Sequence, residues 1–322
     1  MPRLVLRLLA SFAAGLAASG AVAQATFPDK PVRFLLGFAT GGPTDLSVRA
    51  LAAAGQKYLG QPLIVQNMPG AGGTLAMQEI ARGTGDGYTI SMITTSYKAL
   101  TAHQQKPQFD LGQLQTLLGY AEFRHIMFVK ADSPHRTLDD LIRHGRANPG
   151  ALKFGHVGLG TSLHLQGLLF FKGMGVKVTD VPYKGSAEFT NAVLGGHTDL
   201  SFIDIAGIRA LARAGTVRLL VTATPQRFPE FPEVPTTAER GVEGVELFNP
   251  VVGVAIRAGT PPDRVKRLHD ALRRASDDPD FRKAMDDIGL KSGYIPPEQF
   301  DAVIDKASAR AVPLMKEVGM IQ

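Results

Sequence analysis

The feature that most constrains the fold is a repeated unit in which an apolar run ends at a glycine turn and a helical pattern follows. In the first copy, the run Val32 to Phe38 ends at Gly41-Gly42, and a helix is expected from Pro43. Proline is favoured at the first helical position because its missing N–H would have no helical partner there. The free amides that follow, together with the helix dipole, form a site that favours a negative group.

Two further copies follow the same pattern. The strand expected at Leu63 to Gln66 leads into the turn Asn67 to Gly73, and the strand expected at Lys153 to His156 leads into the turn Gly158 to Ser162. Alternating strands and helices predict parallel sheets with right-handed crossovers. The second series of units is expected to form a sheet of its own. In such sheets ligands bind beyond the carboxyl ends of the strands, where the glycine turns lie.

Other segments give more local expectations. The apolar stretch Leu117 to Val129 is interpreted as one strand, and residues 263–321 are interpreted as a helical tail that packs back on the first lobe. Thr137 is expected to cap a helix with Asp140 at its third position, and Gly60 is expected to end the first helix.

The first residues have the pattern of a secretory signal peptide. Arg3 and Arg7 precede an apolar run, Leu8 to Ala18, which is followed by Ala21-Val22-Ala23. We expect cleavage after Ala23, with Gln24 starting the mature chain, and hence a periplasmic protein. The alternative is an N-terminal anchor, but the run is shorter than the roughly 20 residues that a spanning helix needs.

Composition excludes several classes of protein. The 322 residues are 44% hydrophobic and 20% charged, which is ordinary for a globular chain. The formal charge is +6, but Lys and Arg are scattered, so nucleic-acid binding is not expected. There is no Cys, which excludes disulfides, cysteine nucleophiles and thiolate metal sites.

Motifs for catalysis are absent from the sequence. It contains neither the G-x-S-x-G elbow of hydrolases nor the G-x-x-x-x-G-K-[ST] phosphate loop. His125, His156 and His164 have no standard metal-ligand spacing. The expectation is a binding protein with no catalytic residues, no cofactor and no metal.

Several spaced segments resemble one known family. They include KPVRFLLGFATGGPTD, LGQPLIVQNMPGAGG, GDGYTI, NPGALKFGHVGLGTSLH, VPYKG and AGTPPDRVKRL. In order along the mature chain, they are similar to the Bug-type solute receptors of tripartite tricarboxylate transporters. The resemblance implies an α/β, two-lobed periplasmic binding protein of type II. Each lobe would be a sheet flanked by helices, joined by two crossing hinge segments.

The resemblance also implies the lobe boundaries and the site. The signal peptide would be residues 1–23, lobe 1 residues 24–122 and 250–322, and lobe 2 residues 123–249. The turns of one lobe would face the glycine turn of the other across a ligand cleft. The expected ligand-binding residues are Phe38, Ala39, Gly41, Gly42, Thr44, Asp45, Asn67, Ala71, Gly72, Ser96, Gly158, Gly160, Thr161, Ser162, His164 and Asp204.

Several of these residues have a structural interpretation as well. Asp45 is expected to orient its loop more than to touch an anion, whereas Thr161 and Ser162 are candidates for helix caps as well as ligand contacts. His164 is either a structural side chain or a contact. Asp204 either caps the next helix or binds an amine on the ligand.

The expected function is an extracytoplasmic receptor that captures a small carboxylate for the membrane permease subunits of a tripartite transporter. The alternatives are a binding module that feeds a sensor and, with less support, an exported hydrolase. The segment His156-Val157-Gly158 lacks a serine common in the family, and Phe248-Asn249-Pro250 lacks a common tryptophan. The ligand therefore stays open among dicarboxylates, amino acids and aromatic acids. A monomer is expected.

Overall fold

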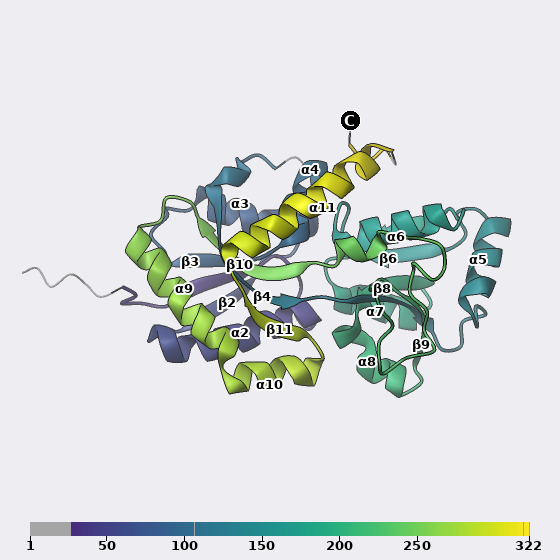
Figure 1. The fold of residues 1–322 in the computed structure, drawn as a ribbon, viewed down its shortest axis with the longest axis horizontal. Coiled ribbons are helices and arrows are strands. Elements are labelled where there is room, and N and C mark those ends of the chain that lie inside the picture. Colours follow the sequence, from purple (N-terminus) through teal and green to yellow (C-terminus); the bar gives the residue numbers. More distant parts are fainter. Residues whose placement is uncertain (1–26, 106, 318, 322) are drawn as a thin grey trace, which may run out of the picture.

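The protein consists of two lobes side by side, each built on its own β-sheet (Figure 1). The computed structural model describes residues 27–105, 107–317 and 319–321. The predicted signal peptide and its cleavage site lie outside these residues.

The first lobe contains a six-stranded sheet in the order β11-β4-β10-β3-β1-β2. Its strands are β1 (Val32–Leu36), β2 (Leu63–Asn67), β3 (Thr89–Thr94), β4 (Leu114–Glu122), β10 (Val251–Arg257) and β11 (Lys291–Ile295). Strand β1 pairs in parallel with β2 and β3, as predicted. The prediction of an all-parallel sheet is wrong for the other half, because β10 runs antiparallel to β3 and β4, and β11 antiparallel to β4.

Helices cover both faces of this sheet. One face carries α2 (Pro43–Leu59), α9 (Pro262–Asp277) and α10 (Pro279–Ile288), and the other carries α3 (Thr74–Arg82) and α11 (Pro297–Glu317). Within β1, Phe34 and Leu36 pack toward α2, whereas Leu35 packs toward α3. The three consecutive apolar residues Phe34 to Leu36 follow from burial of the strand on both faces, whereas Arg33 near its start is exposed.

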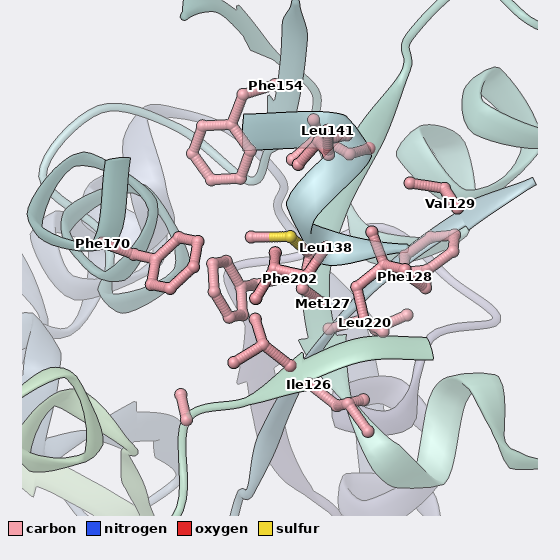
Figure 2. Close-up of a cluster of buried hydrophobic side chains, with 14 of the residues drawn as sticks. Ile126, Met127, Phe128, Val129, Leu138, Leu141, Phe154, Phe170, Phe202 and Leu220 are labelled. Carbon is pink, nitrogen blue, oxygen red and sulfur yellow. The ribbon is translucent and has the colours of Figure 1, made fainter. Parts of the chain in front are cut away.

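The second lobe contains a five-stranded sheet in the order β7-β6-β8-β5-β9. Its strands are β5 (His125–Lys130), β6 (Lys153–His156), β7 (Thr179–Pro182), β8 (Leu200–Asp204) and β9 (Val217–Thr222). Its helices are α5 (Leu138–Ala147), α6 (Ser162–Gly173), α7 (Ser186–Leu194) and α8 (Ile205–Arg213). Figure 2 shows its core, where the ring of Phe202 lies edge-on to Phe154 and Phe170 at centroid distances of 6.5 and 6.0 Å.

Two expectations about the elements are corrected. The stretch Leu117 to Val129 is two strands, β4 and β5, which lie in different sheets because the chain crosses between the lobes at Phe123-Arg124. The tail is not wholly helical, since β11 adds an edge strand to the first sheet. The chain crosses again at Asn249-Pro250, before β10. The domain boundaries drawn from the sequence stay a proposal.

Other local expectations are confirmed. Gly60 ends α2 with a left-handed backbone (φ 82°), and Thr137 and Asp140 form a reciprocal capping box at the start of α5. The tail helices pack on the first sheet. Across the described part of the chain, no helix has both the length and the apolar character to cross a bilayer.

Candidate functional site

A cleft between the lobes collects loops from both sheets. The cavity within it has a volume of about 60 Å³. Nine of the predicted site residues line it: Phe38, Ala39, Gly42, Thr44, Gly72, Ser96, Thr161, Ser162 and Asp204. The remaining seven do not line it: Gly41, Asp45, Asn67, Ala71, Gly158, Gly160 and His164. Ligand contact by any of these residues stays a prediction.

Asp45 holds the first glycine turn in shape from behind. Its carboxylate is 3% exposed and accepts hydrogen bonds from the Gly41 amide (3.1 Å), Arg49 Nε (3.0 Å) and Asn67 Nδ2 (3.0 Å). Burial opposes its ionisation, but these donors outweigh burial and lower the pKa of Asp45. Asn67 also donates to the carbonyl of Phe38 (2.9 Å). Asp45 and Asn67 thus connect the first two turns.

Three helices begin at the cleft without a side-chain cap. They are α2 of the first lobe, and α6 and α7 of the second, whose N-cap residues are Gly42, Thr161 and Gly185. The hydroxyl of Thr161 donates to the Gly158 carbonyl (2.7 Å) and so does not cap its helix. First-turn amides have no helical acceptor, so these termini present N–H groups and partial positive charge to the cleft.

A fourth helix at the cleft, α8, is capped by Asp204. Its carboxylate is 4% exposed and accepts hydrogen bonds from the Ala206 amide (2.8 Å) and the Arg124 amide. The capping interpretation from the sequence is thereby confirmed. Burial raises the pKa of Asp204 to about 7, although both amides favour the charged form.

Two buried imidazoles support the glycine turn of the second lobe. The rings of His156 and His164 stack at 4.3 Å, and their Nδ1 atoms accept the amides of Gly158 (3.2 Å) and Gly160 (3.1 Å). Burial, and then the neighbouring His164, lower the pKa of His156 to about 4. His164 is therefore a support of the loop and does not line the cleft.

The same pair lies near Asp180, and nitrogen and oxygen atoms of the three side chains come within 4.8 Å of one another. Because each Nδ1 accepts an amide proton, each neutral ring carries its own proton on Nε2. A metal ion needs a lone pair at that nitrogen. In this tautomer the three side chains do not fit a metal.

The lobes touch each other around the cleft. Thr101 Oγ1 of the first lobe donates to the Gly160 carbonyl of the second (3.0 Å), and a Cβ added at Gly72 would lie 3.1 Å from Cγ2 of Thr161. The small size of Gly72 lets the two turns meet. The contacts between the lobes therefore involve the loops that border the cleft.

A polar network around Asn249 lies at the end of the cleft where the chain crosses between the lobes. Its Oδ1 accepts from the His125 amide (3.2 Å) and from Gln166 Nε2 (3.0 Å), and its Nδ2 donates to the Ala223 carbonyl (2.6 Å). The ring of His125 pairs with Gln166, and burial lowers the pKa of His125 to about 4. These bonds tie the second crossing segment to the second lobe.

The sequence analysis did not predict ten other residues that line the cleft: Pro43, Thr94, Thr101, Phe123, His125, Val157, Leu163, Ser186, Ile203 and Pro250. A signal existed for Ser186, because VPYKG followed by a helix is a fourth strand–glycine–helix unit. Phe123 and Pro250 lie at the two crossings between the lobes. They could not be assigned to the cleft from the sequence, because the stretch around Phe123 was interpreted as one continuous strand.

Comparison with known proteins identifies the family. The sequence model of the tripartite tricarboxylate transporter family receptor matches residues 47–320. The chain belongs to this receptor family. A relative from Cupriavidus necator, "UPF0065 protein in gbd 5'region", is 36% identical over 97% of this chain and 94% of its own. The resemblance to Bug-type receptors is confirmed.

Solved structures show the same fold. The periplasmic binding protein BugD superposes with a TM-score of 0.85 at 26% identity, over 92% of this receptor and 99% of BugD. MatC from Rhodopseudomonas palustris with bound malate has a TM-score of 0.80 and is 28% identical, over 88% of this receptor and 98% of MatC. Another R. palustris protein, with adipate, has a TM-score of 0.83 and is 28% identical, over 91% of this receptor and 98% of its own chain. The fold is a two-lobed, type II periplasmic binding protein. Family and neighbours are binding receptors, so the chain is a receptor and not an enzyme.

Proposed function

We propose that this receptor captures a small carboxylate in the interlobe cleft, in the periplasm, and delivers it to the membrane subunits of a tripartite transporter. The observation that carries the proposal is the convergence of three uncapped helix N-termini, α2, α6 and α7, on one cleft from both lobes. Such termini bind anions through amide donors and the helix dipole.

The composition of the cleft supports recognition by amides and hydroxyls. Among the described residues that line it, none is Lys or Arg, whereas Thr44, Thr161, Ser162 and Ser186 bring hydroxyl groups to the starts of the three helices. Relatives of similar fold hold malate and adipate. Hydrogen bonds to a charged group contribute about 1.5–3 kcal/mol each, so a few such donors suffice for a small anion.

Binding and closure are coupled in this proposal. A carboxylate that accepts hydrogen bonds from α2 of one lobe and from α6 and α7 of the other stabilises the closed arrangement over an open one. The hinge motion would occur at the crossings Phe123-Arg124 and Asn249-Pro250, with lobes divided at residues 122/123 and 249/250. The ligand-binding residues we propose are the nine predicted ones that line the cleft, supported from behind by Asp45, Asn67 and His164.

The test is a thermal-shift screen of the mature chain, from Gln24, against dicarboxylates, tricarboxylates, acidic amino acids, nicotinate and phthalates. A ligand at about one hundred times its dissociation constant raises the melting temperature by about 5–10 °C. The matched control for each hit is its uncharged carboxamide, which has nearly the same shape but no anion for the helix termini. An equal shift with acid and amide, or no shift with any carboxylate, contradicts the proposal.

Export and delivery need separate tests. Mass spectrometry of the protein from periplasmic extracts should show a chain that begins at Gln24, and a retained N-terminal segment would contradict the predicted cleavage after Ala23. Uptake of the labelled carboxylate by cells should fall when the receptor gene is deleted. Unchanged uptake would favour the alternative of a sensory binding module.

A further inference from the structure

We propose that the cleft selects ligands that carry a single carboxylate, and that Asp204 is the specificity-determining residue that excludes a second one. This inference rests on the proposed function, because it assigns a ligand class to the same cleft. It narrows the open choice among dicarboxylates, amino acids and aromatic acids.

The cleft is lined by few side chains that can carry a charge. Of the described residues that line it, only His125 and Asp204 have titratable side chains. His125 is neutral at physiological pH because burial lowers its pKa to about 4. Any fixed charge on the lining is therefore negative. The positive field at the cleft comes from the uncapped helix termini, since none of the described lining residues is Lys or Arg.

Asp204 lies beside the first crossing segment. It accepts the amide of Arg124, which belongs to the first crossing segment, and it pairs with His125 in the register of β5 and β8. Phe123 and Pro250 lie on the two crossings beside it and line the same cleft. We call these four residues, Phe123, His125, Asp204 and Pro250, the hinge-side wall. The wall is apolar except for a neutral imidazole and a carboxyl group.

The two cations nearest Asp204 do not line the cleft and contact other side chains. The guanidinium of Arg124 lies 5.1 Å from the ring centre of Phe228. Arg209 of α8 forms an ion pair with Glu230 at 2.9 Å. Three titratable groups therefore face Asp204: Arg124 and His125 at the start of the neighbouring strand β5, and Arg209 on α8. None of them lines the cleft as a cation.

A second ligand carboxylate against this wall would meet Asp204 at low dielectric constant. Two carboxylates in such a site cannot both stay ionised at low cost, so one of them takes up a proton. Burial raises the pKa of Asp204 to about 7 even though two amides and two arginines oppose it, and a ligand anion beside Asp204 would raise that pKa further. Dicarboxylate binding must therefore include proton uptake, whereas monocarboxylate binding does not.

The experiment uses three probes of similar length that differ at one end: hexanoate, adipate and ε-aminocaproate. Isothermal titration calorimetry of the wild-type receptor at about pH 8 should show adipate binding at least about tenfold more weakly than hexanoate, since each pH unit above the pKa of Asp204 costs tenfold. The adipate affinity should rise as the pH is lowered to about 6, and the hexanoate affinity should not. Titrations in two buffers of different ionisation enthalpy should detect proton uptake with adipate only.

Variants supply the second readout. Asp204→Asn should strengthen adipate binding and weaken ε-aminocaproate binding, because it removes the negative charge opposite the far end of the ligand. The matched control is Asp132→Asn, which removes a charge from an exposed position on the second lobe. If Asp204→Asn does not fold, the pH and buffer dependence of the wild-type receptor still decides the question.

Adipate binding as tight as hexanoate binding, with no proton uptake, would overturn this inference and leave the proposed function intact. Binding by dicarboxylates or tricarboxylates alone in the wider screen would overturn it in the same way. Failure of every carboxylate in that screen would instead remove the proposed function, and this inference with it.

Discussion

Substitution of Gly42 by alanine should weaken ligand binding without weakening either lobe. The backbone at Gly42 is extended (φ −86°, ψ 169°), a conformation that alanine adopts without strain. A Cβ at this position would lie closer than 3.0 Å to Oγ of Ser186, which belongs to the opposite lobe. The conflict exists only when the lobes are closed, so the substitution acts on closure.

The magnitude follows from how the conflict is relieved. Either Ser186 leaves its rotamer or the lobes stay slightly apart, and a displaced rotamer costs about 0.5–1.5 kcal/mol. A cost of about 1 kcal/mol raises the dissociation constant about fivefold. Calorimetry with the best carboxylate from the thermal screen measures this change, and the melting temperature of the ligand-free variant checks that the fold is intact.

A rescue variant distinguishes closure from local damage. After Ser186→Ala, the nearest atoms to the Cβ of Ala at position 42 are the Cβ of residue 186 at 3.7 Å and the Ala187 amide at 4.0 Å, which are ordinary contacts. The double variant should therefore bind as tightly as Ser186→Ala alone. Unchanged affinity in the single Gly42 variant, or additive losses in the double variant, would refute the reasoning.

Three further outcomes are expected. The imidazoles of His125 and His156 have folded-state pKa values of about 4. The unfolded chain takes up protons first at these two imidazoles, so the stability that they contribute above about pH 6.5 should be lost as the pH falls toward 4, by up to about 3 kcal/mol per imidazole. Asp204, whose pKa is about 7, has an effect of opposite sign over the same range, so the loss should be measured by urea unfolding of the Asp204→Asn variant. Constant stability of that variant down to a pH of about 4.5 would contradict this. Asp45→Ala removes the acceptor for three donors and should lower the free energy of unfolding by about 2 kcal/mol while it weakens ligand binding; wild-type affinity would show that the turn does not depend on Asp45. Glu317→Gln breaks an exposed interlobe pair with Lys172 and should change the ligand affinity by less than about twofold at physiological salt, so a large loss would show that this pair controls closure.

The parts of the fold that the sequence predicted are those with local causes. The glycine turns before α2, α3 and α6 follow from apolar runs that end at glycine, and the boundary residues Gly60 and Thr137 follow from capping preferences. The strand break at Phe123-Arg124 has no such local cause. β4 and β5 are both apolar because each is buried in its own sheet, and only the tertiary pairing shows that they belong to different lobes.

In the candidate site too, residues on the predicted turns could be identified from the sequence, whereas residues placed by tertiary contacts could not. Phe38, Gly42, Thr161 and Ser162 line the cleft because they lie on turns that the pattern predicted. His164 faces away from the cleft toward its partner His156, since the first turn of α6 also packs on β6. Contacts of this kind depend on which strands become neighbours, and a single sequence does not encode that locally.

Small-angle X-ray scattering with and without the carboxylate that gives the largest thermal shift tests the central claim most directly. The ligand should lower the radius of gyration of the wild-type receptor, and its uncharged carboxamide should not. An identical radius of gyration in the ligand-free and saturated states would contradict closure of the two lobes around a carboxylate.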